Sequence, residues 1–250
     1  MDRTSPSGKK CQLEFNVALH ASENIDEPPE FDKVTLFHNG VEEYAMANTS
    51  LVSKSIQDIA TETNTQELFS PCMVGSLESQ FLKLQVQVCN AKKVLDIGTF
   101  TGMSALAMAE GLPKEGQVIT LENDDKAANV AEACFQKSET GYKISLIRGN
   151  AIDSMKKLLK SGEKFDIIFI DADKENYIHY YNLAMEGLLS TNGFILADNS
   201  MCALLYDSSD ERSKRLHEFN QTVKNDMRVE QVILTIREGI TMIKPQKNNV

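Results

Sequence analysis

From Lys92 onward the sequence alternates short apolar runs with amphipathic stretches, which is typical of parallel strands joined by crossover helices. This alternation constrains the fold more than any other feature of the chain. The runs expected to form strands are residues 94–98, 117–122, 143–149, 165–172 and 193–199, and the helices expected among them include 104–110, 127–137, 154–159 and 177–189.

Two further apolar runs, 229–235 and 239–245, follow a helix expected over 211–225. They are separated only by Ile236 to Glu238, which is too short for a crossover. The pair must therefore form an antiparallel hairpin, which we place at the far edge of the sheet. The sequence predicts an α/β domain with a doubly wound, seven-stranded, mostly parallel sheet that ends in this hairpin.

The part of the chain before the sheet has a different pattern. Residues 1–30 are polar, contain three prolines and show no hydrophobic period, which predicts a flexible N-terminal arm. Apolar residues recur at helical spacing over 31–65 and again over 76–90, where the expected stripe is Leu77, Phe81, Leu84 and Val88. We therefore predict a single domain over 31–250 that begins with a helical segment over 31–90.

Composition and charge exclude several classes of function. With 26 Lys and Arg against 36 Asp and Glu, the net charge is -10, so the basic surface that nucleic acid requires is missing. No apolar stretch is long enough to span a membrane, and the N-terminus lacks the apolar core of a signal peptide. The 5 cysteines are scattered without a C-x-x-C pair, which indicates reduced thiols. We expect a cytoplasmic protein without membrane or nucleic-acid partners.

A glycine-rich turn follows the first expected strand, in the run from Asp96 to Gly102. In open α/β sheets this is where a nucleotide-like ligand binds. The spacing G-x-x-x-G differs from the dinucleotide and P-loop patterns, which disfavours a nicotinamide-dependent dehydrogenase. Asp96 would repel phosphate but would suit the ammonium group of S-adenosylmethionine, and Glu122 can accept both hydroxyls of a ribose. The alternative is a tight turn flanked by two exposed acids.

Hard oxygen ligands follow the fourth and fifth expected strands. Asp171, Asp198 and Asn199 would converge, because parallel neighbours end at the same edge of a sheet. Such a set favours magnesium, calcium or manganese over zinc. Lys174 lies three residues after Asp171 and could accept a proton beside the metal. Helix caps, a turn and a surface lysine paired with Asp173 are the structural alternatives.

These segments resemble a known family. Four segments are similar to the cation-dependent O-methyltransferases, the group of the caffeoyl-CoA and catechol O-methyltransferases. They are the run from Ala91 to Thr120, FDIIFIDADKENYIHYYN, GFILADN and NDMRVEQVILTIREGITMIKP. The resemblance implies the class I, Rossmann-like methyltransferase fold, S-adenosylmethionine as donor, and a homodimer. It places the donor-binding residues on Val74, Asp96, Gly98, Thr99, Ser104, Glu122, Ala151 and Asp173. It places the metal ligands on Asp171, Asp198 and Asn199, with Lys174 as general base.

The sequence departs from that family near the expected acceptor pocket. The plant members have Leu-Trp after the Asp-Asn pair, whereas this chain has Ser200-Met201-Cys202 and no tryptophan. The hypothesis is methyl transfer to one hydroxyl of a vicinal aromatic diol, with magnesium as the expected cation and Asp171 and Lys174 as catalytic residues. The alternative is a catalytically silent module that binds S-adenosylmethionine and acts through interactions.

Overall fold

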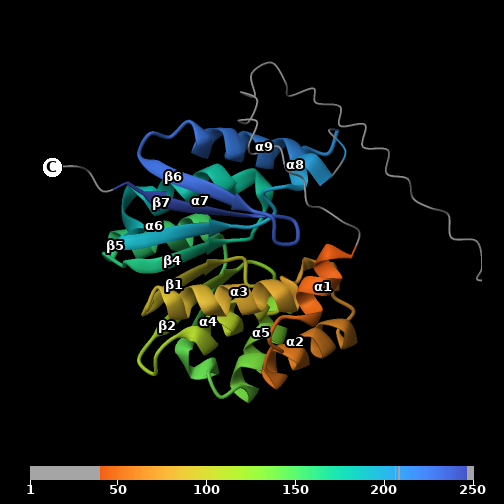
Figure 1. Ribbon diagram of the computed structural model, residues 1–250. Coiled ribbons are helices and arrows are strands. Elements are labelled where there is room, and N and C mark those ends of the chain that lie inside the picture. Colours follow the sequence, from red (N-terminus) through yellow and green to blue (C-terminus); the bar gives the residue numbers. More distant parts are fainter. Residues whose placement is uncertain (1–39, 206, 208, 247–250) are drawn as a thin grey trace, which may run out of the picture. The chain divides into compact units, whose positions relative to one another are not determined.

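The computed structural model describes residues 40–205, 207 and 209–246, and it places a seven-stranded sheet between two layers of helices (Figure 1). The strands are β1 (Lys93–Ile97), β2 (Gln117–Glu122), β3 (Ile144–Arg148), β4 (Phe165–Ile170), β5 (Leu189–Ala197), β6 (Val229–Leu234) and β7 (Ile240–Pro245). Their order is β3-β2-β1-β4-β5-β7-β6, with β1 to β5 parallel and β7 antiparallel to both of its neighbours. The predicted fold class and the edge hairpin are confirmed.

The helices of the described region precede and connect these strands. They are α1 (Val41–Ala47), α2 (Lys54–Thr65), α3 (Gly75–Val88), α4 (Met103–Gly111), α5 (Asp125–Lys137), α6 (Ala151–Lys160), α7 (Tyr177–Leu183), α8 (Cys202–Leu205) and α9 (Glu211–Lys224). The flexible arm predicted for residues 1–30, and the start of the helical segment predicted from residue 31, lie outside the described residues.

Alternate residues of each central strand point to opposite faces of the sheet, and each face has its own core. Val94, Val118 and Phe169 pack with side chains of α2, α3, α4 and α5. Leu95, Leu121 and other residues of the opposite register pack with α6, α7 and α9. Figure 1 shows these two groups of helices on either side of the sheet. Burial on both faces explains the continuous apolar runs of the central strands.

Strands β4 and β5 end earlier than the sequence predicts. β4 ends at Ile170 and β5 at Ala197, so Asp171 and the Asp198-Asn199 pair begin the loops that follow. β5 also starts at Leu189, within the helix that the sequence predicts over 177–189, because Leu189 pairs with Phe165 across a break in register. The predicted site residues therefore stand on loops at the carboxyl edge of the sheet.

Helix α3 buries a different face from the one predicted. Glu78, Ser79, Leu82 and Val86 are buried, whereas Val88 from the predicted stripe is 75% exposed. The reason is close packing on α4, where a Cβ at Gly111 would lie 2.6 Å from the Lys83 carbonyl oxygen. As a consequence, the carboxylate of Glu78 is buried, and this matters for the site described below.

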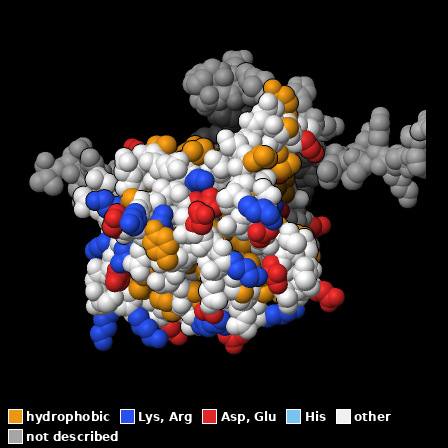
Figure 2. Space-filling model, turned by 90° about the horizontal axis from the view of Figure 1, so that it is seen from below, with side chains coloured by type: hydrophobic (Ala, Val, Ile, Leu, Met, Phe, Trp, Pro, Cys, Tyr) orange, Lys and Arg blue, Asp and Glu red, His pale blue; other side chains and the backbone are white. Residues whose placement is uncertain are grey.

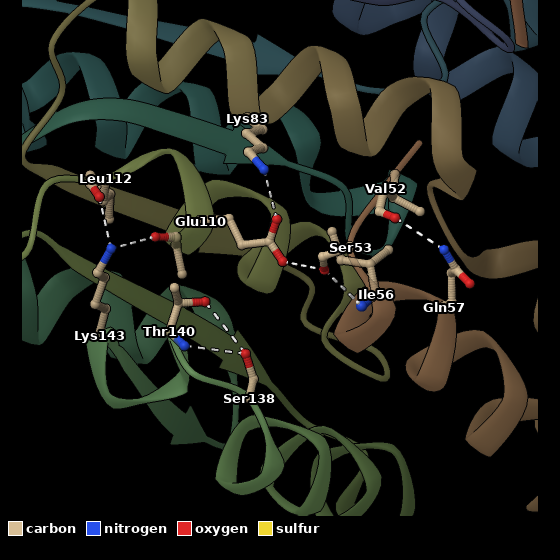
Figure 3. A network of polar contacts seen from close by, with 11 residues as sticks. Val52, Ser53, Ile56, Gln57, Lys83, Glu110, Leu112, Ser138, Thr140 and Lys143 are labelled. Carbon is tan, nitrogen blue, oxygen red and sulfur yellow. Dashed lines mark hydrogen bonds and ion pairs between the residues drawn. The ribbon is translucent and has the colours of Figure 1, made fainter. Parts of the chain in front are cut away.

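A polar network joins the helices on the α3 side of the sheet (Figure 3). Glu110, in the last turn of α4, accepts a hydrogen bond from Lys83 of α3 at 2.9 Å and another from Ser53. Ser53 also caps α2 by accepting a hydrogen bond from Ile56 N. One partly buried carboxylate thus ties α2, α3 and α4 together.

The outer surface carries charges of both signs. On the face seen from below in Figure 2, acidic and basic side chains lie intermixed. The cysteines of the described region, Cys72, Cys89, Cys134 and Cys202, form no disulfide. Within residues 40–205, 207 and 209–246, no helix has the length and apolarity that crossing a bilayer would require.

Candidate active site

A cavity of about 560 Å³ follows the carboxyl edge of the parallel strands. Along the strand order it runs from the segment after β3, past the loops after β2, β1, β4 and β5, to the turn between β6 and β7. Eleven of the twelve site residues that the sequence predicts line it: Val74, Gly98, Thr99, Ser104, Glu122, Ala151, Asp171, Asp173, Lys174, Asp198 and Asn199. The fold therefore brings the predicted donor, metal and base residues into one space.

The glycine-rich turn begins where β1 touches the end of β4. Gly98 has φ +105°, and a Cβ there would lie 2.0 Å from the Asp171 carbonyl oxygen. The amides of Gly98 and Thr99 both donate to the Leu121 carbonyl, at 3.1 and 3.0 Å. Because a side chain at residue 98 would collide with backbone, only glycine permits this close approach of the two loops.

Asp96 is the predicted site residue that the structure does not place on the cavity wall. It lies in β1, it is fully buried, and its carboxylate accepts hydrogen bonds from Thr120 at 2.6 Å and from Ser104 at 3.1 Å. Burial raises the pKa of Asp96 to about 7, although the Thr120 and Ser104 hydrogen bonds lower it. Ser104 does line the cavity, so Asp96 lies directly behind the cavity wall and is hydrogen-bonded to one of its residues. Direct contact with a donor ammonium stays a prediction.

We expect the ligand-free protein to lose stability as the pH rises from 4 to 8, in part through Asp96. Its folded pKa, about 7, lies above the ordinary value of 3.8, so the stabilisation is complete below pH 4 and is lost as the pH rises through 7. Asp96→Asn should flatten that part of the profile, measured by urea unfolding at several pH values. As a control, substitution of the exposed Glu139 by Gln should leave the stability–pH profile of the wild type unchanged. If Asp96→Asn had the same slope as the wild type, Asp96 would not be a source of this pH dependence.

The carboxyl ends of β1, β4 and β5 lie side by side. Asp171 N donates to the Ile97 carbonyl at 2.9 Å, and Asp198 N donates to the Ile170 carbonyl at 3.0 Å. Asn199 has a left-handed backbone, with φ +61°, and its side-chain nitrogen donates to Glu238 at 2.7 Å. Two carboxylates and one amide therefore stand on neighbouring loops of the same cavity.

The chemistry of this donor set fits a divalent cation. Asp198 Oδ1 is buried without a hydrogen-bond partner in the part of the chain that the structure describes. Burial and the nearby charge of Asp171 raise the pKa of Asp198 to about 8. No group of three or more His, Cys, Asp or Glu side chains in the described region could hold a metal ion, so the fit depends on Asn199 as the third oxygen. A bound cation would satisfy the orphaned oxygen and stabilise the ionised carboxylate.

Lys174 lies beside the predicted metal ligands. Its Nζ is 3.0 Å from Asp171 Oδ1 and donates to the Tyr177 hydroxyl at 2.7 Å. The side chains of Lys174 and Asp171 are each 16% exposed, so the amine is largely shielded but still faces the cavity. The structural alternative, a surface lysine paired with Asp173, is not what the described residues show: Lys174 pairs with Asp171, and Asp173 accepts from Tyr180 at 2.5 Å.

The predicted donor side of the cavity is built from backbone and acids. Glu122 accepts hydrogen bonds from Phe100 N at 2.6 Å and from Asn123 N and Asp124 N. These bonds hold its carboxylate at the mouth of the turn after β2. Ala151 starts α6 after Asn150, whose side chain caps that helix.

Sequence reasoning missed four charged residues of the cavity wall: Glu78, Arg212, Arg237 and Glu238. Both carboxylate oxygens of Glu78 are buried without a hydrogen-bond partner, and Arg237 Nη1 lies 3.5 Å from Oε2. Burial, Asp198 and Asp171 hold the pKa of Glu78 well above its usual range, while Arg237 lowers it. Glu78 lies outside the apolar stripe predicted for α3, so spacing within that helix gave no signal for it.

Comparison with known proteins identifies the family. The sequence pattern described as O-methyltransferase matches residues 46–246. The chain belongs to the O-methyltransferase family. The predicted class of enzyme, an S-adenosylmethionine-dependent O-methyltransferase, is thereby confirmed at the level of the family.

Named relatives and solved structures are consistent with this O-methyltransferase assignment. A probable caffeoyl-CoA O-methyltransferase of Dictyostelium discoideum is 32% identical over 210 residues, which cover 75% of this chain and 82% of that protein. A catechol O-methyltransferase of Niastella koreensis is 41% identical over 128 residues, which cover 50% and 57% of the two chains. The structure of an O-methyltransferase from Bacillus cereus in complex with SAH superposes with a TM-score of 0.75 at 26% identity, and the match covers 83% of this chain and 97% of that one.

Proposed function

We propose that this O-methyltransferase transfers the methyl group of S-adenosylmethionine to one hydroxyl of a small aromatic vicinal diol, with the assistance of a divalent cation. The observation that carries the proposal is a single cavity that holds the glycine turn, Lys174 and three oxygen ligands, with Asp198 Oδ1 buried and unpaired in the described structure. The Bacillus cereus structure with bound SAH supports the choice of donor.

The donor would lie along the part of the cavity between β1 and β3. Gly98 lines this part of the cavity, and the methionyl part of the donor would lie beside the turn that Gly98 begins. The carboxylate of Glu122, already fixed by three backbone amides, would accept hydrogen bonds from the ribose hydroxyls. Val74, Thr99, Ser104, Ala151 and Asp173 line the same space.

Asp171, Asp198 and Asn199 would hold the cation, and magnesium is the expected ion because all three ligands are oxygens. When bound there, such an ion would supply positive charge that lowers the pKa of the acceptor hydroxyl. The residues of this chain orient the acceptor and accept its proton. The reaction needs no covalent enzyme intermediate, because the acceptor oxygen attacks the sulfonium methyl group directly.

Lys174 would take the proton from the reacting hydroxyl at Nζ. Tyr177 and Asp171 hold the amine within hydrogen-bonding distance and so fix its direction. Burial and the charges of Asp171 and Asp198 hold the pKa of Tyr177 well above its usual range, so the tyrosine stays a neutral phenol that accepts from Lys174. Asp171 thus has two roles in the proposal, as a cation ligand and as the group that orients the base.

The acceptor would occupy the part of the cavity lined by Phe69, Pro71, Leu216 and Cys202. These apolar side chains supply a surface suited to an aromatic ring. The names of the relatives suggest catechol and caffeoyl compounds as the acceptor classes.

The test is product mass after incubation with S-adenosylmethionine and a panel of catechols, hydroxycinnamoyl esters and flavonoids, with magnesium or with EDTA. We expect a methylated diol with magnesium only. Product of equal yield in EDTA would overturn the role of the cation. Absence of product in both tubes, with donor binding retained in calorimetry, would favour the catalytically silent module instead.

The homodimer and the cytoplasmic location stay predictions. Sedimentation equilibrium and fractionation of cells that express the protein would test them.

A further inference from the structure

The turn between β6 and β7 is bonded to the loop after β5. Ser200 N donates to the Gly239 carbonyl at 2.9 Å, and Met201 N donates to the Glu238 carbonyl at 2.8 Å. Gly239 has φ +92°, and a Cβ there would lie 2.9 Å from Met201 N. The two backbones therefore approach as closely as glycine allows, and the turn and the loop are held as one unit.

A side-chain hydrogen bond continues this contact into the cavity. Asn199 Nδ2 donates to Glu238 Oε2 at 2.7 Å, and the Cys202 thiol lies 3.7 Å from the same oxygen. An ionised carboxylate can only accept, whereas a side-chain amide donates at one end and accepts at the other. Glu238 therefore decides which end of the Asn199 amide faces it, and the amide oxygen is turned away from Glu238.

We propose that Glu238 is a positioning residue, which orients the Asn199 amide so that its oxygen rather than its nitrogen is offered to the divalent cation. This inference rests on the proposed function, in which Asn199 is one of three ligands. A reversed amide would direct two N–H groups at the cation in place of an oxygen. Glu238 acts through Asn199, as partners behind the direct ligands do in other metal sites.

A second effect of Glu238 must be separated from orientation. Its negative charge attracts a cation from a distance, so Glu238→Gln could weaken binding through charge alone. The background Asn199→Asp distinguishes the two causes, because a carboxylate offers oxygen at both ends and needs no orientation. In that background the orientation effect disappears, and removing Glu238's charge also relieves repulsion between two neighbouring carboxylates.

The experiment is a titration with Mn²⁺ alone, with the free ion measured by electron paramagnetic resonance. We expect Glu238→Gln to weaken Mn²⁺ binding about 10-fold, within the range known for residues that orient metal ligands. Glu230→Gln, an exposed acid on the same hairpin, should change it less than about 2-fold. In the Asn199→Asp background, Glu238→Gln should leave the affinity unchanged or raise it. Calorimetric binding of S-adenosylmethionine reports whether each variant is folded.

Three outcomes would contradict the inference. Equal weakening in both backgrounds would assign the effect to charge, and unchanged Mn²⁺ affinity in Glu238→Gln would show that Asn199 needs no orientation. Either result leaves the proposed function intact. A wild-type protein that binds the donor but no Mn²⁺ would overturn the cation in the proposed function and this inference with it.

Discussion

Replacing Lys174 by methionine is expected to lower kcat by about 10²- to 10⁴-fold, the usual contribution of a positioned general base. Methionine keeps much of the length of the side chain but removes the amine that lies 3.0 Å from Asp171 and 2.7 Å from the Tyr177 hydroxyl. Loss of a positive charge beside Asp171 should not weaken binding of a cation. The fall should therefore appear in kcat, with donor binding unchanged in calorimetry.

Lys174→Arg separates proton transfer from charge. The guanidinium keeps the positive charge beside Asp171, but it does not give up a proton in proteins and cannot act as a base. We expect this variant to be nearly as inactive as Lys174→Met in single-turnover measurements with saturating magnesium. If Lys174→Arg kept most of the activity, the positive charge of Lys174 would be its contribution and the general-base role would be wrong.

The sheet was predictable because its strands are buried on both faces. Runs such as 94–98 and 165–172 are apolar almost throughout, and the stretches between them have the length of a crossover helix. Once parallel strands are assigned, the residues after each strand share one edge, and that alone brings Asp171, Asp198 and Lys174 to the same cavity. The ends of the strands were predicted less accurately. The apolar run predicts a strand over 165–172, whereas β4 ends at Ile170 and the loop begins at the next residue.

Glu78 could not be recognised because α3 does not bury its most apolar face. Leu84 and Val88 fit a helical stripe, yet both are exposed, and the neighbouring face with Glu78 and Leu82 turns inward. Which face of α3 is buried depends on how its side chains pack against α4. This is a tertiary effect, which the spacing of apolar residues within one helix cannot predict. The burial of a charged side chain therefore became visible only in the structure.

Arg237 and Glu238 were missed for a different reason. The hairpin itself was predicted, but its turn was treated only as a connection between two strands. Since β7 is antiparallel to β5, with Thr241 opposite Ala197, the turn before β7 must lie beside the end of β5. That step of topology brings Glu238 to Asn199, although 39 residues separate them in the chain.

Gly98→Ala is expected to have the largest effect on stability of any substitution considered. A Cβ at residue 98 would lie 2.0 Å from the Asp171 carbonyl oxygen and 2.7 Å from its carbon, and backbone atoms cannot move aside without shifting the loop after β4. The positive φ of +105° adds strain of about 1–2 kcal/mol, and the overlap adds about 1–3 kcal/mol. We expect the free energy of unfolding in urea to fall by about 2–5 kcal/mol, with donor binding lost.

Gly162→Ala is the matched control for this substitution. Gly162 also has a positive φ, +77°, but a Cβ there would meet nothing within 4 Å, so only the backbone strain of about 1–2 kcal/mol applies. The difference between the two variants therefore isolates the contact between the loops after β1 and β4. That contact sets the distance from the glycine turn to Asp171, so its loss should impair donor binding and cation binding together. If the two substitutions were equally destabilising, the close contact between Gly98 and the Asp171 carbonyl would not contribute to stability as we expect.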